Sequence, residues 1–518
     1  MKQSQNLCES FNAASIRQMW TRSRIYRILL TGAIAYAVLR LTIFVMLHTG
    51  TLPLPEGELV WQDLSLYLDA SRRLLGREDL YPEIPRLYEY QYPPFFALVC
   101  APVLWLPPTL VPIIGALAHL LTYMLLYSRW TKIFCCLGFS RGVEMLARLL
   151  PLWLVFEQFW SDLDLLNVYV LTSLLATFAI EAILGARLGW AALWLVVLLQ
   201  IKPHWGFVVL VPLLLGHWRF FLKLAVLTIA GYAAISGVTM LFVGPVYGWE
   251  QYSQYVELLE KLLYQNSLWR TRDQGFLGYN HSIKQVTVFL AGATPAAMLL
   301  STVIKVLLLV PLPGVEIFRR RRLGPHISRG NLLPALDVFF ALYLLTFIWL
   351  DVVWEIFLGI VIFAYLLAIP LSKTIRIWIC GSFGITALLD IWRLISFGVF
   401  GADIITPPNY VRSDPALYIP LTMIVIVSFY VLLLRRLWAL PPCREDPPQS
   451  HTYADNLGDA ADDGTAAAGK SLGLVVSARS PGGEVSRRPT TSSPQMSTPR
   501  NTGTSNTLTG LGERSWTR

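Results

Sequence analysis

The chain has 518 residues, of which 55% are hydrophobic and only 14% are charged. A mean hydropathy of +0.52 excludes an ordinary water-soluble protein, in which about a quarter of the residues are charged. The net charge of +9 does not indicate nucleic acid as a partner, because the basic residues form short clusters beside apolar runs, as in cytoplasmic loops of membrane proteins. We therefore expect an integral membrane protein in which these clusters set the orientation.

Apolar runs long enough to span a membrane recur along the chain. A bilayer core of about 30 Å is crossed by about 17 to 25 apolar residues, and the runs of this kind lie at 24–46, 109–128, 163–183, 221–243, 333–350, 352–372, 375–397 and 416–438. Shorter runs at 146–160, 188–201 and 203–216 alternate with them. Prolines predict that 92–106 is a half-helix or interfacial helix and that a break interrupts the chain at 291–295. The predicted fold class is an all-α polytopic membrane protein with about twelve transmembrane crossings and both termini in the cytoplasm.

This topology divides the chain into three parts. Residues 1–23 form a cytoplasmic segment, 24–440 form the transmembrane domain, and 441–518 form a cytoplasmic tail whose Ser, Thr, Gly and Pro content predicts disorder. Loops 47–91 and 244–283 then lie outside the cytoplasm. Most polar residues without an obvious structural role fall on the same side, so we expect the reaction centre on the extracytoplasmic face.

The first outer loop contains an amphipathic pattern from Asp63 to Gly76, which predicts a helix lying at the membrane interface. Asp69 has arginines three and four residues later, so it is expected to form a surface ion pair. Asp63 has no cationic partner at helical spacing. It is either the N-cap of this helix or a general base held at the membrane surface, and the two roles are compatible.

Several short elements follow in a recognisable order. They are the helix beginning at Asp63, Leu-Gly at 75–76, Leu-Tyr-Pro at 80–82, Tyr-Gln-Tyr-Pro-Pro at 90–94 and Leu-Pro at 106–107. In this order they resemble the opening of glycosyltransferase family 87, the polyprenol-phosphate-mannose-dependent mannosyltransferases with a C-type multi-span fold. The likeness extends to about residue 290. Gln158 with Asn167 resembles the Gly-Gln-x-Asn element of the family, 200–203 its lysine-proline element, and 279–282 its Asn-x-Ser element.

The chain also departs from the family pattern. Glu157 stands where glycine is usual, and Gln158 and Asn167 are more widely spaced than in the family element. The segment 350–355 contains Trp354 and Glu355 but none of the histidines expected there.

The resemblance implies an inverting transfer of a hexose, mannose by analogy, from a polyprenyl-phosphate donor to an extracytoplasmic glycan or glycolipid. Asp63 would take the proton of the acceptor hydroxyl, while Lys202 or His204 would stabilise the leaving phosphate. The further candidates for binding donor phosphate or substrate are Gln158, Asn167, Tyr67, Tyr92, Asn280, His281, Ser282, Trp354 and Glu355. The expected location is a bacterial plasma membrane, with the active site on the extracytoplasmic face and no cofactor beyond the lipid-linked donor.

Structural alternatives stand beside these roles. Lys202 would snorkel from a short helix, His204 would be an interfacial residue, and Gln158 and Asn167 would tie helices together by hydrogen bonds. Asp162-Leu-Asp164 is the one acidic pair that resembles a metal-binding Asp-x-Asp, and we do not expect a metal.

Two other functions remain open from the sequence. Many spans, broken helices and buried polar residues are also features of a transporter or lipid flippase. However, the ionisable residues gather at one face rather than at the midplane. A non-catalytic membrane scaffold is the other alternative, and it predicts no functional requirement for Asp63.

Overall fold

The computed structural model describes residues 2–49, 51, 62–81, 90–264, 271–323, 333–353, 356–400, 404–405 and 410–439. All of them belong to one compact unit, Met1–Gly464. The expected tail at 441–518 lies outside the described residues. In the described ranges the regular structure is helical, except that β1 (Ile404–Ile405) pairs antiparallel with β2 (Tyr410–Val411). The predicted all-α class therefore describes the molecule apart from this short pairing.

Within the described ranges, five segments are long and apolar enough to cross a membrane. They are α2 (Arg24–His48), α5 (Val111–Cys136), α12 (Trp218–Val243), the segment Pro295–Arg319 and α21 (Leu421–Ala439). Two bent pairs raise the number to seven if each is one span: Leu150–Leu165 with Tyr169–Leu184, bent by 114°, and Lys373–Ala387 with Leu389–Ser396, bent by 45°. The other predicted crossings fall on shorter apolar helices. These helices fit an integral membrane protein.

The remaining elements connect and surround these segments. They are α1 (Lys2–Arg22), α3 (Gln62–Gly76), α4 (Pro94–Cys100), η1 (Ala101–Trp105), α6 (Ser140–Arg148), α7 (Leu150–Leu154), α8 (Glu157–Leu165), α9 (Tyr169–Leu184), α10 (Leu188–Leu199), η2 (Pro203–Val209), α11 (Leu210–Leu214), α13 (Pro245–Tyr264), η3 (Arg272–Gln274), α14 (Ile283–Ala291), α15 (Pro295–Leu309), α16 (Pro311–Leu323), α17 (Leu333–Trp349), α18 (Gly359–Ala368), α19 (Lys373–Ala387), α20 (Leu389–Phe400) and η4 (Pro415–Leu417).

The proline-marked breaks lie where the sequence predicts them. The short helices α4 and η1 end before Leu106, and Gly292, with a φ of 79°, separates α14 from α15. The shorter apolar run expected at 146–160 is divided among α6, α7 and α8. A break at Val155 and Phe156 separates α7 from α8.

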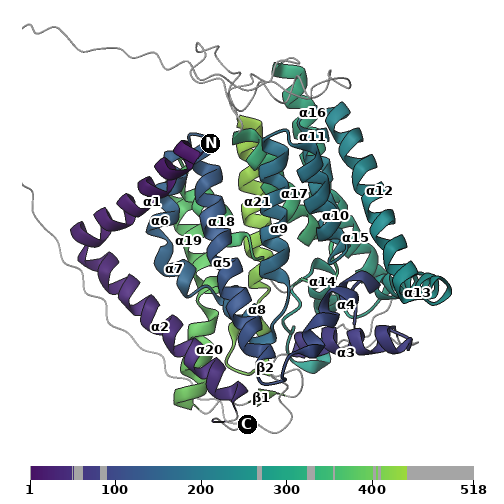
Figure 1. Cartoon of the computed structure of the whole chain (residues 1–518). Coiled ribbons are helices and arrows are strands. Elements are labelled where there is room, and N and C mark those ends of the chain that lie inside the picture. Colours follow the sequence, from purple (N-terminus) through teal and green to yellow (C-terminus); the bar gives the residue numbers. More distant parts are fainter. Residues whose placement is uncertain are drawn as a thin grey trace, which may run out of the picture. The chain divides into compact units, whose positions relative to one another are not determined.

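The helices pack around a core that includes α17 and α18, both of which are apolar on all sides and largely buried. Neighbouring helices include α17 against α21, and α9 against α5 and α10. Figure 1 shows α5, α9, α10, α12 and α21 running in the same general direction, whereas α3 lies crosswise near their lower ends. This crosswise helix carries Asp63.

Candidate functional site

The helix α3 is held by contacts on one side. Tyr67, Leu74 and Ser71 are buried, and the Ser71 hydroxyl lies 2.7 Å from the carbonyl oxygen of Ala97 in α4. The predicted ion pair of Asp69 is confirmed with Arg73, at 2.9 Å. These contacts fix α3 against α4 and leave its charged side exposed.

Asp63 lies in the first turn of α3, one residue inside the helix rather than at the N-cap. Its side chain turns to another part of the chain, because the amide nitrogen Nδ2 of Asn167 donates to Asp63 Oδ2 at 2.5 Å. This hydrogen bond holds Oδ2, and Oδ1 is the second oxygen of the carboxylate. The geometry therefore suits a base better than a helix cap.

Asn167 sits in a tight turn between α8 and α9. Leu166 adopts a left-handed conformation with a φ of 50°, and the carboxylate of Asp162 accepts from the backbone N–H groups of Tyr169 and Val170, at 3.1 and 3.0 Å. Asp162 thus caps α9. The imidazole Nε2 of His119 lies 2.5 Å from the carbonyl oxygen of Asn167, which holds the turn from the other side.

The orientation of the Asn167 amide follows from its partners. Its Oδ1 accepts from the backbone N–H of Val168 at 2.6 Å and from the Tyr67 hydroxyl at 3.0 Å. The Tyr67 and Tyr92 hydroxyls lie 2.9 Å apart. Because Oδ1 faces these donors, Nδ2 must face Asp63.

Lys202 brings a buried positive charge to the same cluster. It follows α10 in an extended conformation, and only 9% of the residue is exposed. Its ammonium lies 3.5 Å from the ring centroid of Tyr169 and 5.3 Å from that of Tyr92, which are cation–π distances. The tyrosine rings therefore hold the cation near Asp63, and its positive charge acts on that carboxylate.

Burial raises the pKa of Asp63 to about 6. The positive charge of Lys202 and the hydrogen bond from Asn167 act against this rise, while the negative charge of Asp162 adds to it. A carboxylate with a pKa near the solution pH is ionised at neutrality yet binds a proton far better than an exposed aspartate does. Acceptance of a proton is thus the chemistry that this site supports.

Other predicted residues lie in contacts that hold the backbone. Gln158 is buried, and its Oε1 accepts from the backbone N–H of Ile356. Asn280 bonds to the backbone of Asp351 and Val353, at 2.9 and 3.0 Å. His281 donates from Nε2 to the carbonyl oxygen of Ala416 at 2.7 Å and accepts at Nδ1 from the N–H of Thr422.

The last predicted residues have different outcomes. Ser282 caps α14 by accepting from the backbone N–H of Gln285 at 3.1 Å. His204 packs beside Trp205, and its buried Nε2 has no hydrogen-bond partner among the described residues. Trp354 and Glu355 lie outside the described residues.

The acidic pair that resembles Asp-x-Asp is already engaged. Asp162 caps α9, and Asp164 pairs with the guanidinium of Arg40, which also pairs with Asp390. In the described part of the chain no three His, Cys, Asp or Glu residues lie together as a metal site. The geometry thus directs both carboxylates to protein partners.

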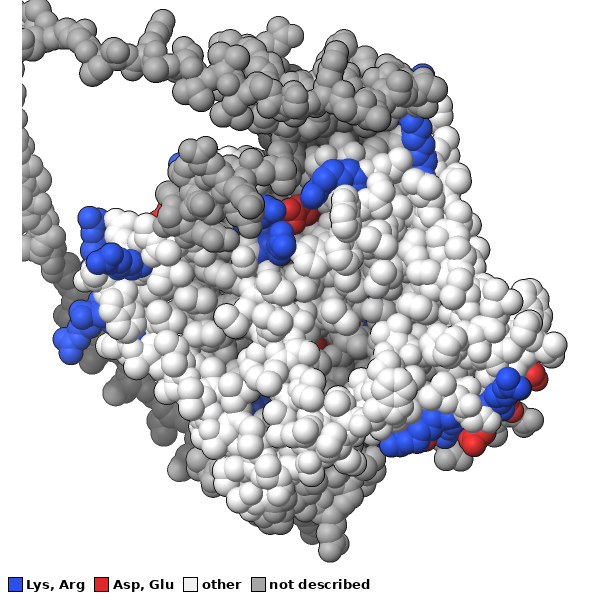
Figure 2. Space-filling model, in the orientation of Figure 1, with Lys and Arg blue, Asp and Glu red and all other residues white. Residues whose placement is uncertain are grey.

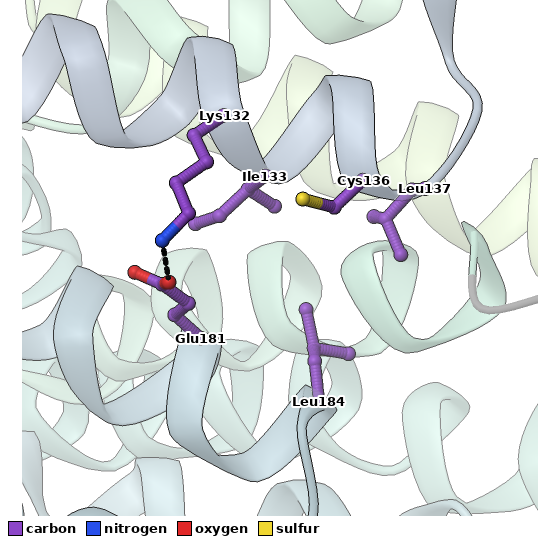
Figure 3. A pocket seen from close by; sticks show the side chains of 6 residues that line it. All are labelled: Lys132, Ile133, Cys136, Leu137, Glu181 and Leu184. Carbon is purple, nitrogen blue, oxygen red and sulfur yellow. Dashed lines mark hydrogen bonds and ion pairs between the residues drawn. The ribbon is translucent and has the colours of Figure 1, made fainter. Parts of the chain in front are cut away.

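A small pocket lies well away from Asp63. Figure 3 shows Lys132 of α5 paired with Glu181 of α9, beside Cys136 and Leu184; the Lys132–Glu181 distance is 2.7 Å. At a rise of about 1.5 Å per helical residue, Lys132 is about 20 Å along α5 from His119, which contacts Asn167. The pocket therefore belongs to the opposite end of these helices.

Two residues of the cluster, His119 and Tyr169, are absent from the sequence prediction. Tyr169 resembles any interfacial tyrosine in the sequence, and His119 lies within an apolar run without a motif. Neither carries a local signal. Only the fold reveals that Tyr169 lies against Lys202 and His119 against Asn167.

Comparison with known proteins gives one match. The sequence model described as glycosyltransferase family 87 matches residues 90–329. No curated protein and no solved structure matches the chain. The matched residues include Tyr92, Asn167 and Lys202, and the match confirms the resemblance found in the sequence. Together with the apolar helices, it supports membership of this chain in glycosyltransferase family 87, as a membrane glycosyltransferase.

Proposed function

We propose that the protein transfers a hexose, with mannose as the first sugar to test, from a polyprenyl-phosphate donor to an extracytoplasmic glycan or glycolipid. The observation that carries the proposal is that a partly buried carboxylate, Asp63, on a helix that runs crosswise to the long apolar helices, lies near a buried ammonium, Lys202. The carboxylate can take a proton from the acceptor hydroxyl, and the ammonium can stabilise the phosphate of the donor.

The proposed reaction inverts the configuration at the sugar. The acceptor oxygen attacks C1 of the hexose, and its proton passes to Oδ1 of Asp63. The bond between C1 and the phosphate oxygen breaks, and its electron pair leaves with the polyprenyl phosphate. Lys202 stabilises the charge that develops there. His204 and the hydroxyls of Tyr67 and Tyr92 are proposed to bind substrate.

The proposed topology places α3 at the extracytoplasmic membrane surface, with about twelve crossings and both termini cytoplasmic. Figure 2 is consistent with this arrangement, because exposed charges lie near the upper edge, at the left edge and at the lower right, and the broad face between them is largely uncharged. In the same view the uncharged face is hollowed near its middle, and charged atoms are visible at the bottom of the hollow. We propose that the lipid donor enters from this face.

The test gives the purified protein in nanodiscs a radiolabelled polyprenyl-phosphate hexose and a membrane glycolipid extract. The expected result is labelled glycolipid from polyprenyl-phosphate mannose. Label transferred only from another lipid-linked hexose would correct the sugar and keep the reaction class. A lack of transfer from every lipid-linked donor would contradict the proposal.

The alternative function is a transporter or lipid flippase, which the broken helices near Asn167 and Gly292 would also suit. A parallel assay in sealed proteoliposomes separates the two. Movement of the lipid-linked sugar between leaflets without formation of a new glycosidic bond would favour the transporter.

A further inference from the structure

The helix α13 is attached to the segment that follows α3. The Tyr247 hydroxyl donates to the carbonyl oxygen of Glu78 at 2.5 Å, and the backbone N–H of Leu80 donates to Oε1 of Gln251 at 2.8 Å. The rings of Tyr81 and Tyr255 lie 5.7 Å apart. Through these contacts, α13 fixes the C-terminal end of the helix that carries Asp63.

The same helix also packs tightly on α12. Gly244, with a φ of 110°, turns the chain from α12 into α13. A Cβ atom on Gly248 would lie 2.6 Å from the Cα of Met240, so the two helices cross where only glycine fits. Tyr252 and Tyr255 are buried on this inner side.

The outer side of α13 is divided into two strips. Trp249 and Val256, seven residues apart and therefore on the same strip, are 67% and 64% exposed. Glu250 and Glu257, each one residue further along and about 100° around the helix, are also exposed. The helix thus presents an inner packed side, an outer apolar strip formed by Trp249 and Val256, and an outer acidic strip. Exposed Glu260, one turn after Val256, ends the apolar strip towards the C-terminus of the helix.

We propose that the apolar strip of Trp249 and Val256 lies against membrane lipid, so that α13 is an in-plane helix at the bilayer surface. An apolar strip beside an acidic one is the pattern of an interfacial helix, and tryptophan favours the headgroup level. The helix begins directly after the apolar span α12. Figure 1 shows it leaving the lower end of α12, level with α4. Figure 2 shows the exposed charges at that margin and uncharged surface above them.

This placement has a structural consequence for Asp63. Lipid on the outer side of α13 and the Gln251 and Tyr247 bonds on its inner side connect the membrane surface to the end of α3. The depth of α3 relative to the membrane surface is thereby set by both α3 and α13. The inference concerns lipid contact alone and does not depend on the transfer reaction.

The test is photo-crosslinking of the full chain in nanodiscs made with radiolabelled phosphatidylcholine. The photoreactive residue p-benzoylphenylalanine replaces Val256, Glu257 or Ile229, one at a time. Ile229 is a positive control because it is 69% exposed on α12. All three positions are solvent- or lipid-exposed, so the fold is expected to tolerate the replacement.

The expected result is several-fold more lipid label on the protein from position 256 than from position 257, close to the yield from position 229. Equal labelling at 256 and 257 would overturn the proposal. A crosslinked dimer at position 256 in place of the lipid adduct would also overturn it, because the strip would then be a contact between copies of this chain. Neither outcome requires glycosyl transfer, so the two proposals are tested separately.

Discussion

Two polar regions of the molecule resemble elements of the same family, yet their hydrogen bonds differ in kind. In the segment 280–282, the side chains bond mainly to backbone groups, as Asn280 does to Asp351 and Val353. Around Asp63 the side chains contact one another: a carboxylate, an amide, two phenols and an ammonium. Bonds to the backbone hold loops in place, whereas a cluster of facing side chains retains groups for a substrate. We infer that the segment 280–282 holds the fold together, whereas the side chains around Asp63 act on the substrate.

The largest expected effect is that of Asp63→Asn. Loss of a general base lowers the rate by about 10² to 10⁴-fold, measured as transfer of radiolabelled sugar. Asp69→Asn is the matched control, because it removes an exposed carboxylate from the same helix, and we expect it to retain activity. Similar losses in both variants would show that α3 is merely sensitive to charge.

The same variant makes a prediction about stability. Burial raises the folded-state pKa of Asp63 from 3.8 to about 6, so the folded protein binds this proton more tightly than the unfolded chain does. Stability from this group is therefore lost as the pH rises from about 4 to about 6. At neutral pH the buried ionised carboxylate lowers the free energy of unfolding. Asp63→Asn should therefore melt at the wild-type temperature or higher. A clear drop in melting temperature would indicate a structural role.

Removal of the buried cation should have the next largest effect. Lys202→Gln is expected to reduce the rate constant for transfer by about 10² to 10³-fold, the range for loss of one electrostatic contact to developing charge. Lys223→Gln, on the exposed side of α12, is the control. An unchanged rate constant in Lys202→Gln would exclude the proposed role of Lys202 in stabilising the leaving phosphate.

The pH dependence of the transfer rate tests whether Asn167 controls the protonation of Asp63. The rate should fall as the pH drops below about 6, because the base is then protonated. Asn167→Ala removes a hydrogen bond that favours the ionised carboxylate, so the midpoint of this acid limb should move to higher pH. Transfer rates measured between about pH 4.5 and about pH 8 locate this midpoint. A midpoint that stays in place would remove Asn167 from the account.

The smallest expected effect on chemistry is that of Asn280→Ala. It leaves the N–H of Val353 and the carbonyl of Asp351 without their side-chain partner, which costs about 1–3 kcal/mol of stability. A lower melting temperature with normal activity per folded molecule is expected. Loss of activity at an unchanged melting temperature would move Asn280 from the scaffold to the reaction.

Much of the helical framework is predictable from the sequence, because membrane spans require long apolar runs and prolines mark their ends. The breaks near 106 and 292 follow from such signals. The division of 146–160 into three helices follows only in part: Pro151 marks the first turn of α7, but the break at Val155 and Phe156 has neither proline nor glycine. An apolar run indicates which segment lies in the membrane, but it does not indicate where the helix bends.

The site was predictable only in part. Residue type and family resemblance single out Asp63, Tyr67, Tyr92, Asn167 and Lys202, which the fold brings together. The same signals also single out Gln158 and His281, whose side chains face backbone groups elsewhere. The direction of a polar side chain near a membrane surface depends on turns such as the one at Leu166, and local sequence does not encode it.

The most direct test of the central comparison measures single-turnover transfer and thermal unfolding on Asp63→Asn and Asn280→Ala in one set of preparations. The account predicts that Asp63→Asn loses transfer and keeps its melting temperature, whereas Asn280→Ala melts earlier and keeps transfer. Transfer at the wild-type rate by Asp63→Asn would contradict the assignment of Asp63 as the base.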